Sequence, residues 1–259
     1  MSDYEDLLVT REGAVLTIAI NRTDAGNKLR AKTCYEIVDA IRELKMDPTL
    51  RAAILTGVGE KFFCIGGEHD ETVTVDPSQV IPIVDVYQAI DTVPKPVIAA
   101  VNGFAVGGGN VLANVCDLTI AADSAVFRQV GPMVGSFDAG YGTWYLEDSI
   151  GRKRAKELWY LNDKYSAQEA LEIGLVNKVV PLADLRTAAA ELAARIATRS
   201  PIAIGALKGA FSARHNGVSG QSRLAHDQHL TLYLTTQEAH ETSAAFTERR
   251  DPDPEKFWK

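Results

Sequence analysis

The sequence has few cysteines, no excess of basic charge and no long apolar run. Its 259 residues include only Cys34, Cys64 and Cys116, whose wide spacing makes neither a disulfide framework nor a CxxC metal clamp. Lysine and arginine total 27 against 34 aspartates and glutamates, so the net charge of −7 disfavours bulk nucleic-acid binding. The longest apolar stretch, residues 96–101, is far shorter than the roughly 20 residues that span a bilayer. Because the N-terminus is acidic where a signal peptide is basic, we expect a cytoplasmic protein that binds neither nucleic acid nor membranes.

Several common catalytic motifs are also missing. The histidines form no HExxH motif, and although His226 and His229 are spaced to share a helix face, no acidic residue has the spacing of a further metal ligand. Ser136 lacks the GxSxG surroundings of a serine-hydrolase nucleophile. Residues 103–109 are rich in glycine but lack the GxGxxG order of a dinucleotide-binding turn. We therefore expect no metal centre, no serine hydrolase and no Rossmann-type cofactor site.

The order of apolar patterns predicts an α/β fold. The expected strands cover residues 7–10, 15–20, 53–56, 97–101 and 118–121, and the expected helices cover residues 32–44, 77–91, 111–115 and 181–198. Residues 166–169 and 235–238 match the helix capping box, and residues 251–255 read as an extended tail. Strands that alternate with helices favour parallel βαβ units. We divide the chain into a core, residues 1–200, and a C-terminal helical region, residues 201–259, which packs on the core and on a neighbouring subunit.

Two glycine-rich turns are the strongest local features that point to chemistry. Residues 62–67 follow the strand at 53–56, and residues 104–109 follow the strand at 97–101. Glycine lets backbone N–H groups approach a ligand without a Cβ in the way. Two such turns can form an oxyanion hole with two donors. The alternative interpretation is a pair of ordinary tight turns.

A second group of chemically useful residues lies between Ser136 and Gly142. Asp138 is a candidate general base, although it is equally suited to cap a helix that begins near Gly142. Tyr233 lies in an apolar stretch, where most tyrosines serve packing. Arg249 belongs to a small basic cluster that suits either a solvated tail or a pyrophosphate contact.

Several longer segments resemble the crotonase (enoyl-CoA hydratase/isomerase) superfamily. They are Asn21-Arg22 and residues 63–68, 95–109 and 116–122. The resemblance implies a spiral of ββα turns, a trimer or dimer of trimers, and acyl-CoA thioester substrates. It implies that the N–H groups of Gly67 and Gly108 hold the thioester oxygen as an enolate forms. By the same resemblance, the acyl-CoA site includes Gly26, Ile65, Gly66, Glu68, His69, Phe104, Gly107, Gln129, Val130, Gly131, Trp159 and Arg249.

The sequence departs from the hydratases of this superfamily at two catalytic positions. Where those enzymes carry a pair of glutamates, this chain has Val111 and Gly131. Neither residue transfers protons, so simple hydration of an enoyl-CoA is disfavoured.

Residues 127–142 instead resemble the branch that holds 2-ketocyclohexanecarboxyl-CoA hydrolase and 1,4-dihydroxy-2-naphthoyl-CoA synthase. In that branch the equivalents of Ser136, Asp138 and Tyr233 line the acyl pocket. The synthase type usually has threonine at the position of Val130, which helps the equivalents of Gln129, Gly131 and Trp159 to hold a bicarbonate ion.

The resemblance therefore favours a C–C hydrolase that opens a cyclic β-ketoacyl-CoA. Such an enzyme has no tightly bound cofactor, since coenzyme A is part of the substrate. The alternatives are the synthase, which would use bicarbonate, and a non-catalytic acyl-CoA-binding homologue. The segment between Gly67 and Pro94, the pocket lid in the family, is shorter here than in either relative, so the acyl group can differ from both.

Overall fold

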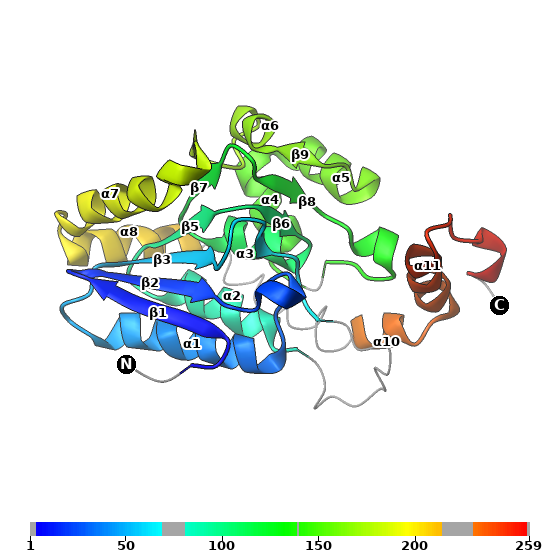
Figure 1. Ribbon diagram of the computed structural model, residues 1–259, viewed down its shortest axis with the longest axis horizontal. Coiled ribbons are helices and arrows are strands. Elements are labelled where there is room, and N and C mark those ends of the chain that lie inside the picture. The colour runs from blue at the N-terminus through cyan, green and yellow to red at the C-terminus, as the bar shows by residue number, and fades with distance from the viewer. Residues whose placement is uncertain (1–3, 69–80, 139, 214–229, 258–259) are drawn as a thin grey trace.

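Two β-sheets form the framework of the computed structural model, which describes residues 4–68, 81–138, 140–213 and 230–257 (Figure 1). The larger sheet has the order β1 (Leu7–Glu12), β2 (Val15–Ile20), β3 (Ala52–Gly57), β5 (Val97–Val101), β7 (Leu118–Ala122) and β10 (Lys178–Val180). The smaller sheet has the order β4 (Phe62–Cys64), β6 (Phe104–Val106), β8 (Val126–Arg128) and β9 (Tyr165–Ser166).

The larger sheet confirms the predicted parallel arrangement. Strands β1 and β2 form an antiparallel hairpin, and β2, β3, β5, β7 and β10 then pair in parallel. Every residue of β3 and β5 is buried, as expected of parallel strands covered on both faces.

The smaller sheet was not predicted as strands. The two segments that were interpreted as glycine-rich turns begin with strands β4 and β6. Each strand is three residues long, and the two strands pair in parallel. Three residues are too few to show the period of two that identifies a strand. Along the chain, one strand of the larger sheet is followed by one strand of the smaller sheet and then by a helix. This order, β3-β4-α2 and then β5-β6-α3, is a spiral of ββα turns.

Helices surround both sheets (Figure 1). The α-helices are α1 (Ala31–Met46), α2 (Ile83–Thr92), α3 (Gly108–Val115), α4 (Gly142–Ile150), α5 (Arg152–Leu161), α6 (Ala167–Glu172), α7 (Leu185–Ala197), α8 (Pro201–Ala213), α10 (Thr231–Leu234) and α11 (Gln237–Glu248). Short 3₁₀ turns are η1 (Thr23–Ala25), η3 (Gly131–Val134), η4 (Leu182–Asp184) and η6 (Pro254–Lys256). No helix of the described residues has both the length and the apolar character that crossing a membrane requires.

Most predicted helices form, with shifted ends. Helix α2 begins at Ile83 after Pro82, and residues 77–80 of the predicted helix lie outside the described residues. Helix α3 begins three residues earlier than predicted, within its glycine run. The cap predicted at residues 235–238 lies one residue too early. Thr236 caps α11 by accepting a hydrogen bond from the Ala239 N–H. The box at 166–169 forms as predicted. The tail is extended only as far as η6.

The C-terminal helices lie at opposite ends of the molecule. Figure 1 shows α8 beside α7 at one end, and α10 and α11 at the other. Helix α8 is joined to the core by an ion pair, in which the Nζ of the buried Lys208 lies 2.6 Å from Oδ2 of Asp117, whose side chain is 26% exposed. Helix α11 packs against η3. The predicted role of residues 201–259 in subunit contacts stays a prediction.

Candidate active site

The two glycine turns lie directly against each other. Because β4 and β6 are parallel neighbours, the turns that follow them leave the same edge of the smaller sheet. A Cβ added to Gly66 would lie 3.2 Å from the backbone nitrogen of Gly108. Gly66 and Gly107 have φ angles of +95° and +55°, which side-chain-bearing residues rarely adopt. The turns thus require glycine both for conformation and for their close approach.

The directions of the Gly67 and Gly108 N–H groups follow from the carbonyls of the same peptide units. The Gly66 carbonyl accepts a hydrogen bond of 2.8 Å from the Leu29 N–H. In a trans peptide the N–H points opposite to the carbonyl, so the Gly67 N–H points away from Leu29. The Gly107 carbonyl accepts from Asn110 within α3, so the Gly108 N–H points out of the helix N-terminus.

Neither of these N–H groups has a hydrogen-bond acceptor among the residues that the structure describes. Such donors, one of them at a positive helix terminus, are chemically suited to stabilise an oxyanion.

Asp138 caps helix α4 with its side chain. Its Oδ1 accepts hydrogen bonds from the N–H groups of Gly140 (3.1 Å) and Gly142 (3.2 Å), and its Oδ2 accepts from Thr143 (2.6 Å). The capping interpretation is therefore confirmed. Burial nevertheless raises the pKa of Asp138 above its usual value, although these N–H donors act in the opposite direction. A carboxylate with a raised pKa accepts a proton more readily, so the cap does not exclude acid–base chemistry.

Gly142 is where three parts of the site meet. A Cβ at this position would lie 2.8 Å from Oδ1 of Asp138, 2.8 Å from Val111 on α3 and 2.9 Å from Trp159 on α5. Val111 is one helical turn after Gly108. The surroundings of Gly142 thus bring Asp138 close to Val111, which lies on α3, the helix whose first residue is Gly108.

Two buried polar atoms near η3 have no hydrogen-bond partner in the part of the chain that the structure describes. They are Oε1 of Gln129, which is 1% exposed, and Nε1 of Trp159, which is 8% exposed. Gln129 immediately precedes Val130 and η3, and η3 packs against α5, which carries Trp159. Unpaired buried polar atoms are uncommon because each costs desolvation energy. They are therefore available to a polar ligand.

Other predicted residues cluster around the first glycine turn. A Cβ on Gly26 would lie 2.6 Å from Cδ1 of Ile65. Glu68 forms an ion pair of 3.0 Å with Arg22. Phe104 packs on Phe62, with ring centroids 6.0 Å apart.

Around the second turn and the Asp138 loop, a Cβ on Gly107 would lie 3.6 Å from Val130. The Ser136 N–H donates to the Gly131 carbonyl (2.8 Å). Tyr233 packs edge-on against Phe137, with centroids 5.3 Å apart.

The remaining predicted residues are separate from this cluster or outside the described residues. His69 and the pair His226 and His229 lie outside the described residues. Arg249 is exposed at the end of α11. Its neighbours in the proposed basic cluster are engaged elsewhere, because Arg250 and Lys256 both pair with Glu241, at 2.5 and 3.0 Å. Within the described ranges, no group of His, Cys, Asp and Glu is arranged to hold a metal ion.

Comparison with known proteins places the chain in a family. The family model described as enoyl-CoA hydratase/isomerase matches residues 10–256. The chain belongs to this family.

Solved structures agree with this assignment. A crystal structure of an enoyl-CoA hydratase from Mycobacterium avium subsp. paratuberculosis K-10 has a TM-score of 0.84 at 27% identity, over 96% of this chain and 98% of that chain. An enoyl-CoA hydratase from Bacillus anthracis is 34% identical with a TM-score of 0.73, over 96% and 98% of the chains. A carnitinyl-CoA hydratase from Mycobacterium avium is 30% identical with a TM-score of 0.79, over the same shares.

This member of the enoyl-CoA hydratase/isomerase family has backbone packed closely against Gly131, one of the two positions where the resemblance implies that hydratases carry a glutamate. A Cβ on Gly131 would lie 3.0 Å from Cα of Phe137 and 3.2 Å from its nitrogen. A side chain at this position would require that backbone to move by a few tenths of an ångström. At the other position, Val111 is buried and apolar.

Sequence reasoning missed Tyr87, which is buried on α2 and whose hydroxyl donates to the Gly108 carbonyl at 2.9 Å. Tyr141, whose phenol belongs to the segment between Ser136 and Gly142 that the sequence singles out, precedes α4 with a φ of +56°. Tyr87 fits the apolar spacing of its helix, and only the contacts of the folded chain distinguish it.

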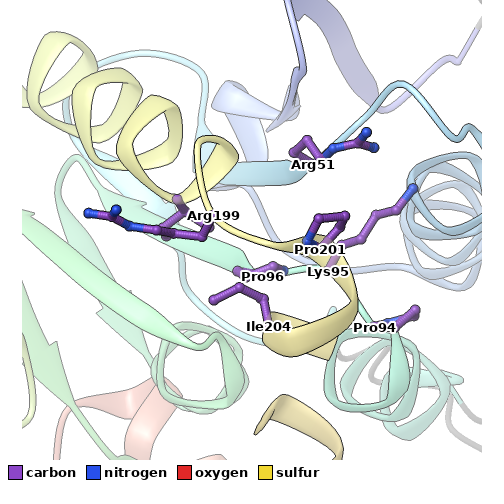
Figure 2. Close-up of a pocket in the computed structure, with 8 residues that line it drawn as sticks. Arg51, Pro94, Lys95, Pro96, Arg199, Pro201 and Ile204 are labelled. Carbon is purple, nitrogen blue, oxygen red and sulfur yellow. The ribbon is translucent and has the colours of Figure 1, made fainter. Parts of the chain in front are cut away.

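A separate hollow shares no lining residue with this site. It lies before β5 and is lined by Arg51, Pro94, Lys95, Pro96, Ile196, Arg199, Pro201 and Ile204. Figure 2 shows the guanidinium groups of Arg51 and Arg199 pointing in opposite directions. The Nζ of Lys95 donates to the carbonyls of Leu44 and Asp47, both at 2.6 Å. The three cations do not converge on a ligand.

Proposed function

We propose that the protein is an acyl-CoA C–C hydrolase that opens the ring of a cyclic β-ketoacyl-CoA. The observation that carries the proposal is one cluster that contains a carboxylate of raised pKa and two glycine N–H groups with no acceptor among the described residues. The two positions of the hydratase glutamates hold Val111 and the closely packed Gly131. The N–H groups suit a thioester oxygen that becomes negative, and Asp138 suits the proton transfers.

In the proposed reaction, Asp138 removes a proton from water as the water oxygen adds to the ring ketone. The bond between the former ketone carbon and the α-carbon then breaks, and its electrons move into the thioester. The resulting enolate oxygen is held by the N–H groups of Gly67 and Gly108, each worth about 2.7–4 kcal/mol when preorganised. Asp138 returns the proton to the α-carbon. The net change is the addition of one water molecule, which leaves a dicarboxylic acid mono-CoA thioester.

Ser136 and Tyr233 are proposed to line the acyl pocket. Phe137, on which Tyr233 packs, is the neighbour of both Ser136 and Asp138, so Tyr233 of the same chain approaches this loop. An assembly of three subunits, or of two such trimers, remains part of the proposal.

The test compares the wild type with Asp138→Asn on 2-ketocyclohexanecarboxyl-CoA, with ring opening followed by mass spectrometry. We expect turnover to fall by about 10²–10⁴-fold, the usual contribution of a general base, while the Kd for the substrate changes little. The matched control is Asp123→Asn, because Asp123 also caps a backbone N–H, that of Leu182 at 3.3 Å, but lies outside the site. Full activity of Asp138→Asn would remove Asp138 from the mechanism. A wild type that leaves the ring closed would refute the hydrolase.

The second candidate is the naphthoyl-CoA synthase reaction, an intramolecular Claisen condensation through the same enolate. The unpaired Oε1 of Gln129 and Nε1 of Trp159 favour it, because an acceptor and a donor together fit a bicarbonate ion. Val130 supplies no hydroxyl to such a site. Bicarbonate, when bound there, would supply a base.

Incubation with o-succinylbenzoyl-CoA, with and without bicarbonate, decides between the two reactions. A naphthoyl chromophore that requires bicarbonate would establish the synthase. Binding of CoA thioesters without turnover of a broad panel would instead indicate a non-catalytic acyl-CoA-binding protein.

A further inference from the structure

Tyr87 makes a contact with the second glycine turn that the proposed mechanism does not use. The side chain is 2% exposed, and its hydroxyl donates a hydrogen bond of 2.9 Å to the Gly108 carbonyl. A Cβ added to Gly108 would lie only 3.1 Å from the Tyr87 oxygen and 2.8 Å from Cδ1 of Ile83. The first turns of α2 therefore press directly against the residue that presents the free N–H.

The hydrogen bond from Tyr87 holds one side of the Gly108 donor. On the other side, the Gly107 N–H donates to the Arg128 carbonyl at 2.9 Å. The peptide unit that carries the Gly108 N–H is held by its own carbonyl, that of Gly107, which accepts from the Asn110 N–H at 3.0 Å. Tyr87 holds the next peptide unit through the Gly108 carbonyl. Glycine has no Cβ to restrict rotation between these two units, so the bonds on both sides together decide where the N–H points.

Tyr87 also contacts the element that carries the carboxylate. Its ring packs against that of Tyr141, with centroids 5.9 Å apart, and Tyr141 immediately precedes α4, whose N-terminus Asp138 caps. Burial, with Cys64, Asp138 and Cys34 nearby, raises the pKa of Tyr87 well above its usual value. The hydroxyl therefore keeps its proton and stays a donor across the working pH range.

We propose that Tyr87 is a positioning residue that aims the Gly108 N–H at the thioester oxygen by holding the Gly108 carbonyl. The inference rests on the proposed role of the two glycine turns. Both proposed donors are main-chain N–H groups, and Tyr87 is a side chain that orients one of them. Removal of the hydroxyl should weaken polarisation of the thioester without weakening its binding to the same degree.

The test uses Tyr87→Phe and a ligand that does not react. Cyclohexanecarboxyl-CoA with a ¹³C-labelled thioester carbonyl lacks the ring ketone, so it reports polarisation without turnover. Infrared difference spectra give the shift of the carbonyl stretch on binding. For the wild type we expect a downshift, and for Tyr87→Phe we expect less than half of it, with Kd changed by less than about threefold. In turnover, kcat should fall about tenfold with KM nearly unchanged, less than the 10²–10³ lost when a donor is removed.

Tyr145→Phe is the matched control. It also removes a tyrosine hydroxyl, which donates to Asp91 at 2.5 Å, and it keeps the ring that packs on Tyr141. It does not touch Gly108, so its carbonyl shift should equal that of the wild type. If Tyr87→Phe does not fold, Tyr87→Met, which also lacks the donor but adapts its shape, is measured in the same way.

The outcomes separate the inference from the proposed function. A Tyr87→Phe shift equal to that of the wild type would overturn the role of Tyr87 while leaving the glycine donors in place. A wild type that binds the ligand with no carbonyl shift would overturn the role of the glycine turns themselves. An equal loss of shift in Tyr87→Phe and Tyr145→Phe would mean a general packing effect and would also overturn the inference.

Discussion

Gly142→Ala is the most direct test of how the site is packed. The new methyl group would lie 2.8 Å from Oδ1 of Asp138, 2.8 Å from Cγ2 of Val111 and 2.9 Å from Cζ2 of Trp159. Favourable contacts between heavy atoms begin at about 3.5 Å, so each neighbour would have to move by roughly 0.6 Å or more. The neighbours belong to three different elements, so no single rotation relieves all three contacts.

Overpacking of this kind costs about 1–3 kcal/mol. At roughly 2–4 °C for each kcal/mol in a chain of this size, Tm should fall by about 2–12 °C. The control is Gly209→Ala in α8, where an added Cβ meets nothing within 4 Å. Alanine is favoured over glycine in a helix by about 0.5–1 kcal/mol, so this variant should be more stable than the wild type.

The assay is thermal unfolding followed by circular dichroism, with turnover measured on the same samples. We expect opposite signs of ΔTm for the two variants, and a lower kcat for Gly142→Ala because its methyl group displaces the Asp138 carboxylate. A Gly142→Ala protein with wild-type Tm and kcat would refute the close meeting of Asp138, Val111 and Trp159 around Gly142.

Two further predictions concern charged residues away from the site. Lys208→Met leaves the partly buried Asp117 carboxylate without its cation and should lower the free energy of unfolding in urea by about 1–3 kcal/mol. Most of the loss should be recovered by adding Asp117→Asn, and an unchanged single variant would contradict this. Hydrogen bonds, first from Arg250, lower the pKa of Glu241 from 4.5 to about 2, so its stabilising effect is present above pH 4.5 and is lost as the pH falls towards 2. Glu241→Gln should therefore flatten the dependence of the urea midpoint on pH in this window, and an unaltered slope would disprove the interpretation.

Much of the fold was predictable because its longer elements carry their own periodicity. Helix α1 buries Ile37, Ile41 and Leu44 on one face, as their spacing predicted. The smaller sheet was not predictable, because its strands are held by neighbours distant in the chain and not by a local pattern. Phe62 of β4 pairs with Phe104 of β6, for example. The early start of α3 was missed because glycine has a low helix propensity, which the packing of Gly108 and Gly109 overrides.

The candidate site, like the fold, was predictable from the sequence only in part. Its glycines and Asp138 were identified from residue type and local context, and Asp138 indeed caps the helix it was expected to cap. Tyr87 was missed because its importance lies in a hydrogen bond to a residue 21 positions away. For the basic cluster at the C-terminus, the sequence does not show that Glu241 pairs with both Arg250 and Lys256. The role of Arg249 stays a prediction.

The sequence by itself determined the class of strands and helices and the glycines that permit close backbone approach. These are properties of single residues and short patterns, which depend on local sterics and hydrophobicity. Only the tertiary structure decided that Gly66 meets Gly108, that the backbone of Phe137 lies close to Gly131, and that the Tyr87 hydroxyl bonds to the Gly108 carbonyl. Such contacts join segments far apart in the chain, and the packing of both sheets and their helices together selects them.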